Sequence, residues 1–133
     1  YVFGYTILND VSARDVQTAH KQWYFGKSLD GFTPIGPCIV TADEFEAYPP
    51  KLPIRCFVNG EKRQDSNTAL QIFDIDHVIA ELSQGMTLKA GTIIATGTPA
   101  GVGMGMDPPQ FLKPGDVVRC EIDGIGTLTN PVR

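Results

Sequence analysis

The chain has 133 residues, 42% hydrophobic and 20% charged, a balance typical of one globular domain spanning residues 1–133. Its net charge of -4 comes from interspersed acidic and basic residues, so no basic patch predicts a nucleic-acid partner. The longest apolar runs are strand-sized, so we expect no membrane-spanning segment, and the start does not have the pattern of a signal peptide.

Strand and helix signals alternate in the first part of the chain. Residues 2–9 are rich in β-branched and aromatic side chains and predict a buried strand. A helix should follow and end at about His20, because Ser12 and Asp15 have the spacing of a capping box. Residues 23–37 mix aromatic residues with glycine and proline, which predicts a packed loop.

Two dipeptides predict tight hairpins in the rest of the chain. Asn59-Gly60 and Asp123-Gly124 each lie between runs that can extend, and both pairs suit a turn that needs positive φ. Strand signals outnumber helix signals, so we expect an α+β fold that is mainly β. Its sheet should be mainly antiparallel or mixed, rolled up as a β-roll or barrel with two helices.

One helix and one further strand are predicted between these hairpins. Asp74 or Asp76 can cap a helix that ends at Gly85. Residues 91–97 form a short apolar run that predicts a strand.

The three cysteines are widely spaced and odd in number. Cys38, Cys56 and Cys120 each lie in an apolar, strand-like segment, which favours free thiols in the core over disulfides or a zinc site. Free thiols are typical of a reducing compartment, so we expect a cytoplasmic protein.

The stretch NDVSARDVQ, residues 9–17, contains two aspartates that differ in their local role. Asp15 lies in the first helical turn, where a carboxylate satisfies an end amide and complements the helix dipole. Asp10 ends the preceding strand, where a carboxylate can face a cleft and bind Mg²⁺ or Mn²⁺. The alternative is that Asp10 closes a turn or caps the helix itself.

Three further side chains are candidates for a site near Asp10. Arg14 and Gln17 are three positions apart on one helix face, although Arg14 can equally pair with a carboxylate in solvent. Lys27 lies in an apolar, glycine-containing loop that can hold its amine inward to stabilise an enolate. The alternative is an ordinary exposed lysine. Both histidines, His20 and His77, are expected to be structural or exposed.

The glycine-rich stretch of residues 95–105 follows an apolar run. Thr98, between Gly97 and Pro99, can present its hydroxyl and nearby backbone amides to an anion. The stretch fits neither nucleotide-binding pattern, because no Gly-Lys-Ser/Thr and no helix follows the glycines. The alternative is a flexible glycine loop.

Together, the motifs FGYTILNDVSARDVQ, GKSLDGFTPIGP and IIATGTPAGVG resemble the fumarylacetoacetate hydrolase family, in this order and over essentially the whole chain. The resemblance implies a mixed β-roll and a homodimer that acts on 2-oxo and β-diketo acids. It also implies a divalent cation, Mg²⁺ or Mn²⁺, with Ca²⁺ as a further option. Position by position, it implies Asp10 as metal ligand, Lys27 and Arg14 as catalytic residues, and substrate contacts by Gln17, Gly97 and Thr98.

The sequence departs from the family pattern at the other metal ligands. The family's Glu-x-Glu ligands and its general base lie upstream of the position of Asp10, and the only similar spacing, in residues 44–48, comes after Lys27. We therefore expect the C-terminal part of a catalytic domain. The predicted reaction is hydrolytic cleavage of a C–C bond in an acylpyruvate or fumarylacetoacetate-like acid. The alternatives are an isomerase or decarboxylase of 2-oxo diacids, or a non-catalytic fragment.

Overall fold

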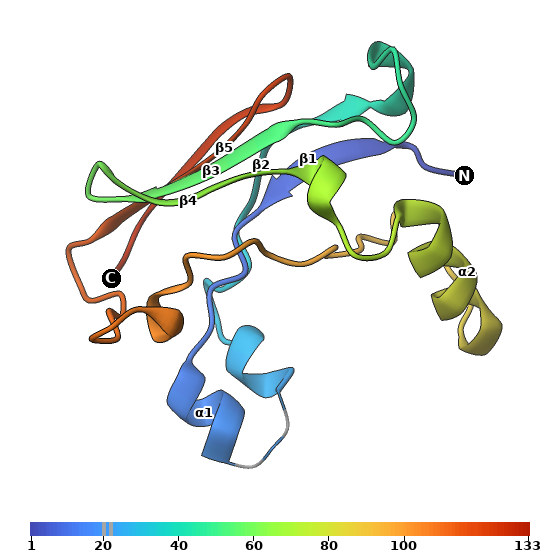
Figure 1. Ribbon diagram of the computed structural model, residues 1–133. Coiled ribbons are helices and arrows are strands. Elements are labelled where there is room, and N and C mark those ends of the chain that lie inside the picture. Colours follow the sequence, from blue (N-terminus) through green and yellow to red (C-terminus); the bar gives the residue numbers. More distant parts are fainter. Residues whose placement is uncertain (20, 22) are drawn as a thin grey trace.

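The computed structural model describes residues 1–19, 21 and 23–133, which form two antiparallel sheets and two α-helices. The first sheet pairs β1 (Gly4–Leu8) with β2 (Ile35–Thr41). The second has the order β4-β3-β5-β6, built from β3 (Pro53–Val58), β4 (Glu61–Asn67), β5 (Val117–Ile122) and β6 (Gly126–Pro131). Figure 1 shows the strands gathered at the top of the view, with α1 (Arg14–Ala19) below and α2 (Ile75–Gly85) to the side. The mainly β fold with two helices is confirmed.

Both predicted hairpins are present. Asn59 and Gly60 have φ values of 52° and 84°, as a type I′ turn between β3 and β4 requires. Gly124, with φ 81°, turns β5 into β6. These glycine-containing turns fix the register of β4 on β3 and of β6 on β5.

The second helix is confirmed with its cap. The Asp74 carboxylate accepts a hydrogen bond from the His77 amide at 2.8 Å, and the helix ends at Gly85. The predicted strand at residues 91–97 is wrong, since this segment belongs to neither sheet. Ile93 is 56% exposed. An apolar run becomes a strand only where a neighbour completes its hydrogen bonds, and no described strand pairs with this one.

The first helix is present but is not capped by Ser12. It starts at Arg14 and ends at Ala19, while His20 lies outside the described residues. The Ser12 hydroxyl donates to the Asp10 carbonyl at 3.2 Å and accepts from Lys27, so the predicted capping box is wrong. The hydroxyl is drawn away from the helix amides because a charged donor lies within its reach.

Only part of the predicted packed loop is correct, because its aromatic residues Trp23, Tyr24 and Phe25 are 69%, 76% and 53% exposed. A 3₁₀ turn, η1 (Phe25–Lys27), forms within residues 23–37, and the last three residues of that range already belong to β2.

The core lies between the two sheets. Its buried members are Ile7, Ile122, Ile125 and Leu128, with Tyr5, Val40, Phe45, Leu52, Ile54 and Cys120 packed around them. All three cysteines are free, as predicted. Cys56 and Cys120 are half-buried register partners, but the prediction of a core position is wrong for Cys38, which is exposed. Cys38 lies at the rim of the core, where its Sγ donates to the Ile125 carbonyl at 3.6 Å while the residue stays exposed.

Asp116 joins the turn after β3 to the start of β5. It is buried, and its carboxylate accepts from the Asn59 side-chain amide at 2.9 Å and from the Lys113 backbone amide at 3.0 Å. The hydrogen bond from Asn59 is the largest of the causes that hold the pKa of the Asp116 carboxyl below its ordinary value, and the bond from Lys113 adds to it.

Among the described residues, no helix is long and apolar enough to span a bilayer.

The lowered pKa of Asp116 makes stability depend on acid. The unfolded chain binds the proton more tightly, so the stabilisation is present above the ordinary pKa of about 3.9 and is lost as the pH falls through the folded pKa. Between pH 6 and pH 3, we expect the urea concentration at the midpoint of unfolding to fall less in Asp116→Asn than in the unchanged chain. The exposed Asp43→Asn serves as control, and an equal fall in the unchanged chain and Asp116→Asn would contradict this.

Candidate functional site

A lysine, a serine and an aspartate meet just beyond the end of β1. The Lys27 ammonium, at the end of η1, lies 2.5 Å from the Asp10 carboxylate and 3.0 Å from the Ser12 hydroxyl. The side chains of Lys27 and Asp10 are 30% and 40% exposed. This Asp10–Ser12–Lys27 cluster is therefore a charge pair that solutes can reach. The open alternative of an unengaged surface lysine does not hold.

Gly26 allows this cluster to form. It is buried, and its carbonyl accepts from the Ala13 amide at 2.8 Å. A Cβ at this position would lie 2.8 Å from the Ala13 carbonyl oxygen and 2.9 Å from Gln17 Cβ. Because these contacts are shorter than real Cβ contacts, only glycine lets η1 lie against α1 and bring Lys27 to Asp10.

Gly26→Ala should lower the free energy of unfolding by about 1–3 kcal/mol, the usual cost of overpacking, and move η1 away from α1. Urea denaturation measures the first effect. Amide hydrogen exchange at residues 25–28, expected to rise, measures the second. Gly85→Ala is the matched control because no atom lies within 4 Å of its Cβ position. Equal effects of the two substitutions would contradict the close-contact explanation.

Arg14 and Gln17 bind each other on α1. The Arg14 guanidinium donates to the Gln17 side-chain oxygen at 2.8 Å, and Gln17 is only 6% exposed. A buried amide oxygen with a charged donor fixes the direction of the guanidinium. No described hydrogen bond or ion pair joins these two residues to Asp10 or Lys27.

The Thr98 hydroxyl is held by a residue that the sequence analysis missed. Gln64, on β4, donates through its side-chain nitrogen to Thr98 Oγ1 and to the Pro99 carbonyl, both at 2.9 Å. Gly97 has φ 106°, which only glycine adopts readily. Gln64 lies in a strand of mostly polar residues, so no sequence signal distinguished it. No described hydrogen bond connects Thr98 with the Asp10–Ser12–Lys27 cluster.

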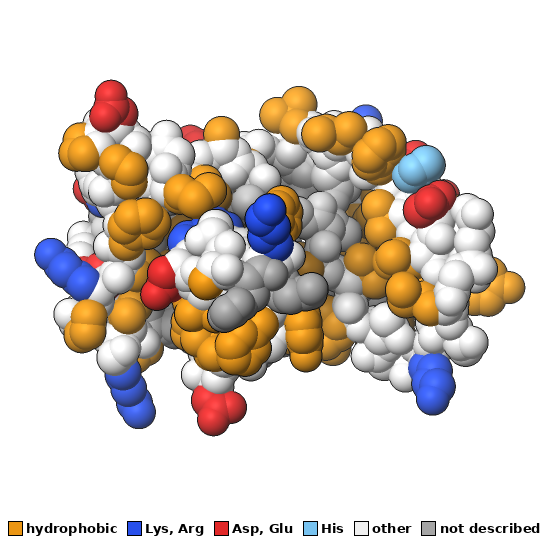
Figure 2. Space-filling view, turned by 90° about the horizontal axis from the view of Figure 1, so that it is seen from below, with side chains coloured by type: hydrophobic (Ala, Val, Ile, Leu, Met, Phe, Trp, Pro, Cys, Tyr) orange, Lys and Arg blue, Asp and Glu red, His pale blue; other side chains and the backbone are white. Residues whose placement is uncertain are grey.

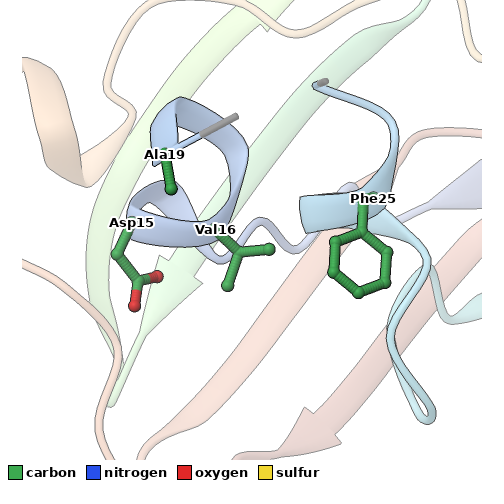
Figure 3. A pocket seen from close by; sticks show the side chains of 4 residues that line it. All are labelled: Asp15, Val16, Ala19 and Phe25. Carbon is green, nitrogen blue, oxygen red and sulfur yellow. The ribbon is translucent and has the colours of Figure 1, made fainter. Parts of the chain in front are cut away.

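Two hollows lie beside these residues. One, of about 330 Å³, is lined by Asp15, Val16 and Ala19 of α1 and by the Phe25 ring (Figure 3). The other, of about 460 Å³, is lined mainly by residues near the end of β1 and near the end of β6, including Asn9 and Asn130. Seen from below, hydrophobic side chains cover much of the face in Figure 2. Neither hollow is lined by a predicted site residue, so the predicted roles stay predictions.

Comparison with known proteins decides the family. The family model described as fumarylacetoacetate (FAA) hydrolase C-terminal matches residues 1–133. The chain belongs to the fumarylacetoacetate hydrolase family. A relative in Bacillus subtilis named oxaloacetate tautomerase YisK is 52% identical over 132 residues, covering 99% of this chain and 44% of the relative.

Solved structures of the fumarylacetoacetate hydrolase family share the fold. A fumarylacetoacetate hydrolase from the psychrophile Exiguobacterium antarcticum is 54% identical with a TM-score of 0.94, covering 98% of this chain and 47% of that one. A 2-hydroxyhepta-2,4-diene-1,7-dioate isomerase from Mycobacterium marinum is 47% identical with a TM-score of 0.84. The match covers 97% of this chain and 47% of the isomerase. The chain thus spans less than half the length of these relatives.

The fumarylacetoacetate hydrolase family is one of metal-dependent enzymes, so we tested the donor set for a divalent cation. Asp10 offers one carboxylate, the right ligand type for Mg²⁺ or Mn²⁺, and Lys27 already pairs with it. Among the described residues, no group of three or more His, Cys, Asp or Glu side chains gathers. Glu44 and Glu46, which have the Glu-x-Glu spacing, are exposed. The described donors do not fit a complete cation site, and we derive no step through a metal.

Proposed function

We propose that the chain is part of an enzyme that enolises a 2-oxo acid, acting as a tautomerase or isomerase. The observation that carries the proposal is the Asp10–Ser12–Lys27 cluster, in which an ammonium is held 2.5 Å from a carboxylate at the end of β1. A fixed ammonium stabilises the negative charge that develops on a carbonyl oxygen during enolisation. The relatives named as an oxaloacetate tautomerase and a heptadienedioate isomerase support this choice of reaction.

In this proposal one site residue stabilises the developing charge and others bind and orient the substrate. A general base takes the C3 proton, and Lys27 donates to the substrate's 2-oxo oxygen as that oxygen becomes anionic. The family resemblance implies a base that lies upstream of Asp10. Arg14, held by Gln17, and the Thr98 hydroxyl bind the substrate's carboxylates. The proton returns to another position, to O2 in a tautomerase or to a distant carbon in an isomerase.

Hydrolytic cleavage of an acylpyruvate is the second candidate, favoured by the relative named as a fumarylacetoacetate hydrolase. Water adds to the distal carbonyl, the C–C bond breaks, and its electron pair becomes the enolate that Lys27 stabilises. Oxaloacetate decarboxylation would pass through the same enolate.

Assays of the chain with Mg²⁺ or Mn²⁺ distinguish these reactions. Oxaloacetate tests enol-to-keto exchange and decarboxylation, an acylpyruvate tests hydrolysis, and 2-hydroxyhepta-2,4-diene-1,7-dioate tests isomerisation. We expect exchange of oxaloacetate to be the fastest. No turnover of any of the three above the rate without protein would overturn the enzyme proposal and favour a non-catalytic fragment.

Mn²⁺ should bind this chain weakly, with a Kd of about 1 mM or higher, because Asp10 is the one carboxylate of the Asp10–Ser12–Lys27 cluster. Asp10→Ala should weaken binding further, and Asp15→Ala, in the same stretch, should not. Calorimetric titration provides the measurement. Micromolar binding that Asp10→Ala abolishes would contradict this and reveal a full ligand set.

The assembly and location of the protein are also proposals. We propose a homodimer in the cytoplasm, with a small 2-oxo acid as ligand and neither nucleic acid nor membrane as partner. Light scattering on the purified chain gives the molar mass that decides between monomer and dimer.

A further inference from the structure

Gln64 makes two hydrogen bonds to the segment that carries Thr98. Its side-chain nitrogen is 2.9 Å from both Thr98 Oγ1 and the Pro99 carbonyl oxygen. An amide NH₂ has two hydrogens, so one is available for each acceptor. Both donors of this side chain are therefore used within residues 98–99.

The Pro99 carbonyl determines which way the Gln64 amide faces. A carbonyl oxygen only accepts hydrogen bonds, so the group beside it must be the NH₂ and not the amide oxygen. The same NH₂ then donates to Thr98 Oγ1. The Thr98 hydroxyl hydrogen is consequently free to donate elsewhere, and Thr98 is exposed.

The backbone around Gln64 lies against the same segment. Gly101 has φ 105°, and a Cβ there would lie 1.9 Å from the Arg63 carbonyl oxygen and 3.2 Å from Gln64 Cγ. The loop thus touches β4 at Gly101 as well as at Thr98 and Pro99. These contacts make β4 the support of the loop.

Gln64 is itself fixed by the middle of the sheet. It is the register partner of Cys56, which is the partner of Cys120, which in turn faces Leu128 in the core. Directly opposed residues of antiparallel strands share one face of a sheet. The row Gln64–Cys56–Cys120–Leu128 therefore runs from the loop to the core.

We propose that Gln64 is a positioning residue that holds Thr98 and orients its hydroxyl as a hydrogen-bond donor to a substrate carboxylate. The inference rests on the proposed function, since it assigns the polarity of a contact within that same site. It explains why the loop presents a donor, the polarity that an anionic 2-oxo acid requires.

Gln64→Glu is the sharpest test because it keeps the shape and reverses the polarity. A carboxylate would repel the Pro99 carbonyl and take the Thr98 hydroxyl hydrogen for itself. We expect KM for oxaloacetate to rise about 10- to 100-fold, the effect of losing a hydrogen bond to a charged group, with a smaller change in kcat. The neutral variant Gln64→Leu should raise KM less, and amide exchange at residues 97–101 should become faster.

Thr98→Val, Thr98→Ser and the exposed Gln84→Leu complete the set. Thr98→Val should raise KM like Gln64→Glu, whereas Thr98→Ser and Gln84→Leu should stay within about twofold of the unchanged chain. An effect of Thr98→Val without one of Gln64→Glu would overturn the positioning role and leave the proposed function intact. No effect of Thr98→Val would overturn the inference and remove Thr98 from the substrate contacts, whereas no turnover by the unchanged chain would overturn the proposed function as well. Faster exchange throughout the chain in Gln64→Leu would indicate a purely structural residue and overturn the inference.

Discussion

Replacing Lys27 by Met should lower turnover of oxaloacetate about 100- to 1,000-fold, the range found when one preorganised donor is removed from a reacting oxyanion. The ammonium is fixed by Asp10 and Ser12, so it needs no reorganisation as charge develops. The free energy of unfolding should change little, because a partly exposed ion pair contributes only about 0–1 kcal/mol.

The experiment compares kcat of Lys27→Met with that of Lys51→Met, an exposed lysine between β2 and β3. Urea denaturation of both variants checks that the fold is retained. Lys27→Arg should recover part of the activity, because it keeps the charge with a different geometry. Unchanged turnover in a folded Lys27→Met would remove this lysine from the mechanism.

Gly101→Ala should detach the Thr98 loop from β4. Its Cβ would lie 1.9 Å from the Arg63 carbonyl oxygen, a backbone atom that cannot rotate away, and φ is 105°. Overpacking and the positive φ together cost on the order of 3 kcal/mol, which moving the exposed loop can partly relieve. We expect both a lower unfolding free energy and a strong loss of turnover, because Thr98 leaves Gln64.

Gly105→Ala is the control for this substitution, since its nearest neighbour, Val102 Cγ2, lies at an ordinary 3.7 Å. Amide exchange at residues 97–101 should increase in Gly101→Ala alone. Equal amide exchange and equal turnover in the two variants would show that the contact between the loop and β4 does not affect activity.

Local signals predicted the elements whose cause is itself local. Asn59-Gly60 makes its turn through backbone conformations of two adjacent residues, and Asp74 caps α2 through an amide three positions away. The capping box predicted at Ser12 is absent because a competing donor, the Lys27 ammonium, comes from 15 residues along the chain. The strand predicted at residues 91–97 is absent because a strand needs a neighbouring strand to pair with, which the propensity of its own residues does not supply.

In the candidate site, too, the sequence predicted single residues but not the contacts between distant parts of the chain. The sequence identified Asp10 and Lys27 separately, yet their meeting depends on the close contact of Gly26 with α1. It identified Thr98 but not Gln64, since a polar residue on an edge strand has the same pattern whether it meets water or a loop. Tertiary contacts of this kind leave no periodicity to read.

The row from Leu128 through Cys120 and Cys56 to Gln64 also bears on how sequence variation reaches the loop. Each member is the register partner of the next, so a larger side chain at either half-buried cysteine presses on its neighbours in the row. An exchange of Cys120 for a bulkier residue would then shift Gln64, two strands away, and with it Thr98. Under the proposed function, substitutions in the interior of the sheet would then alter ligand preference without touching the ligand.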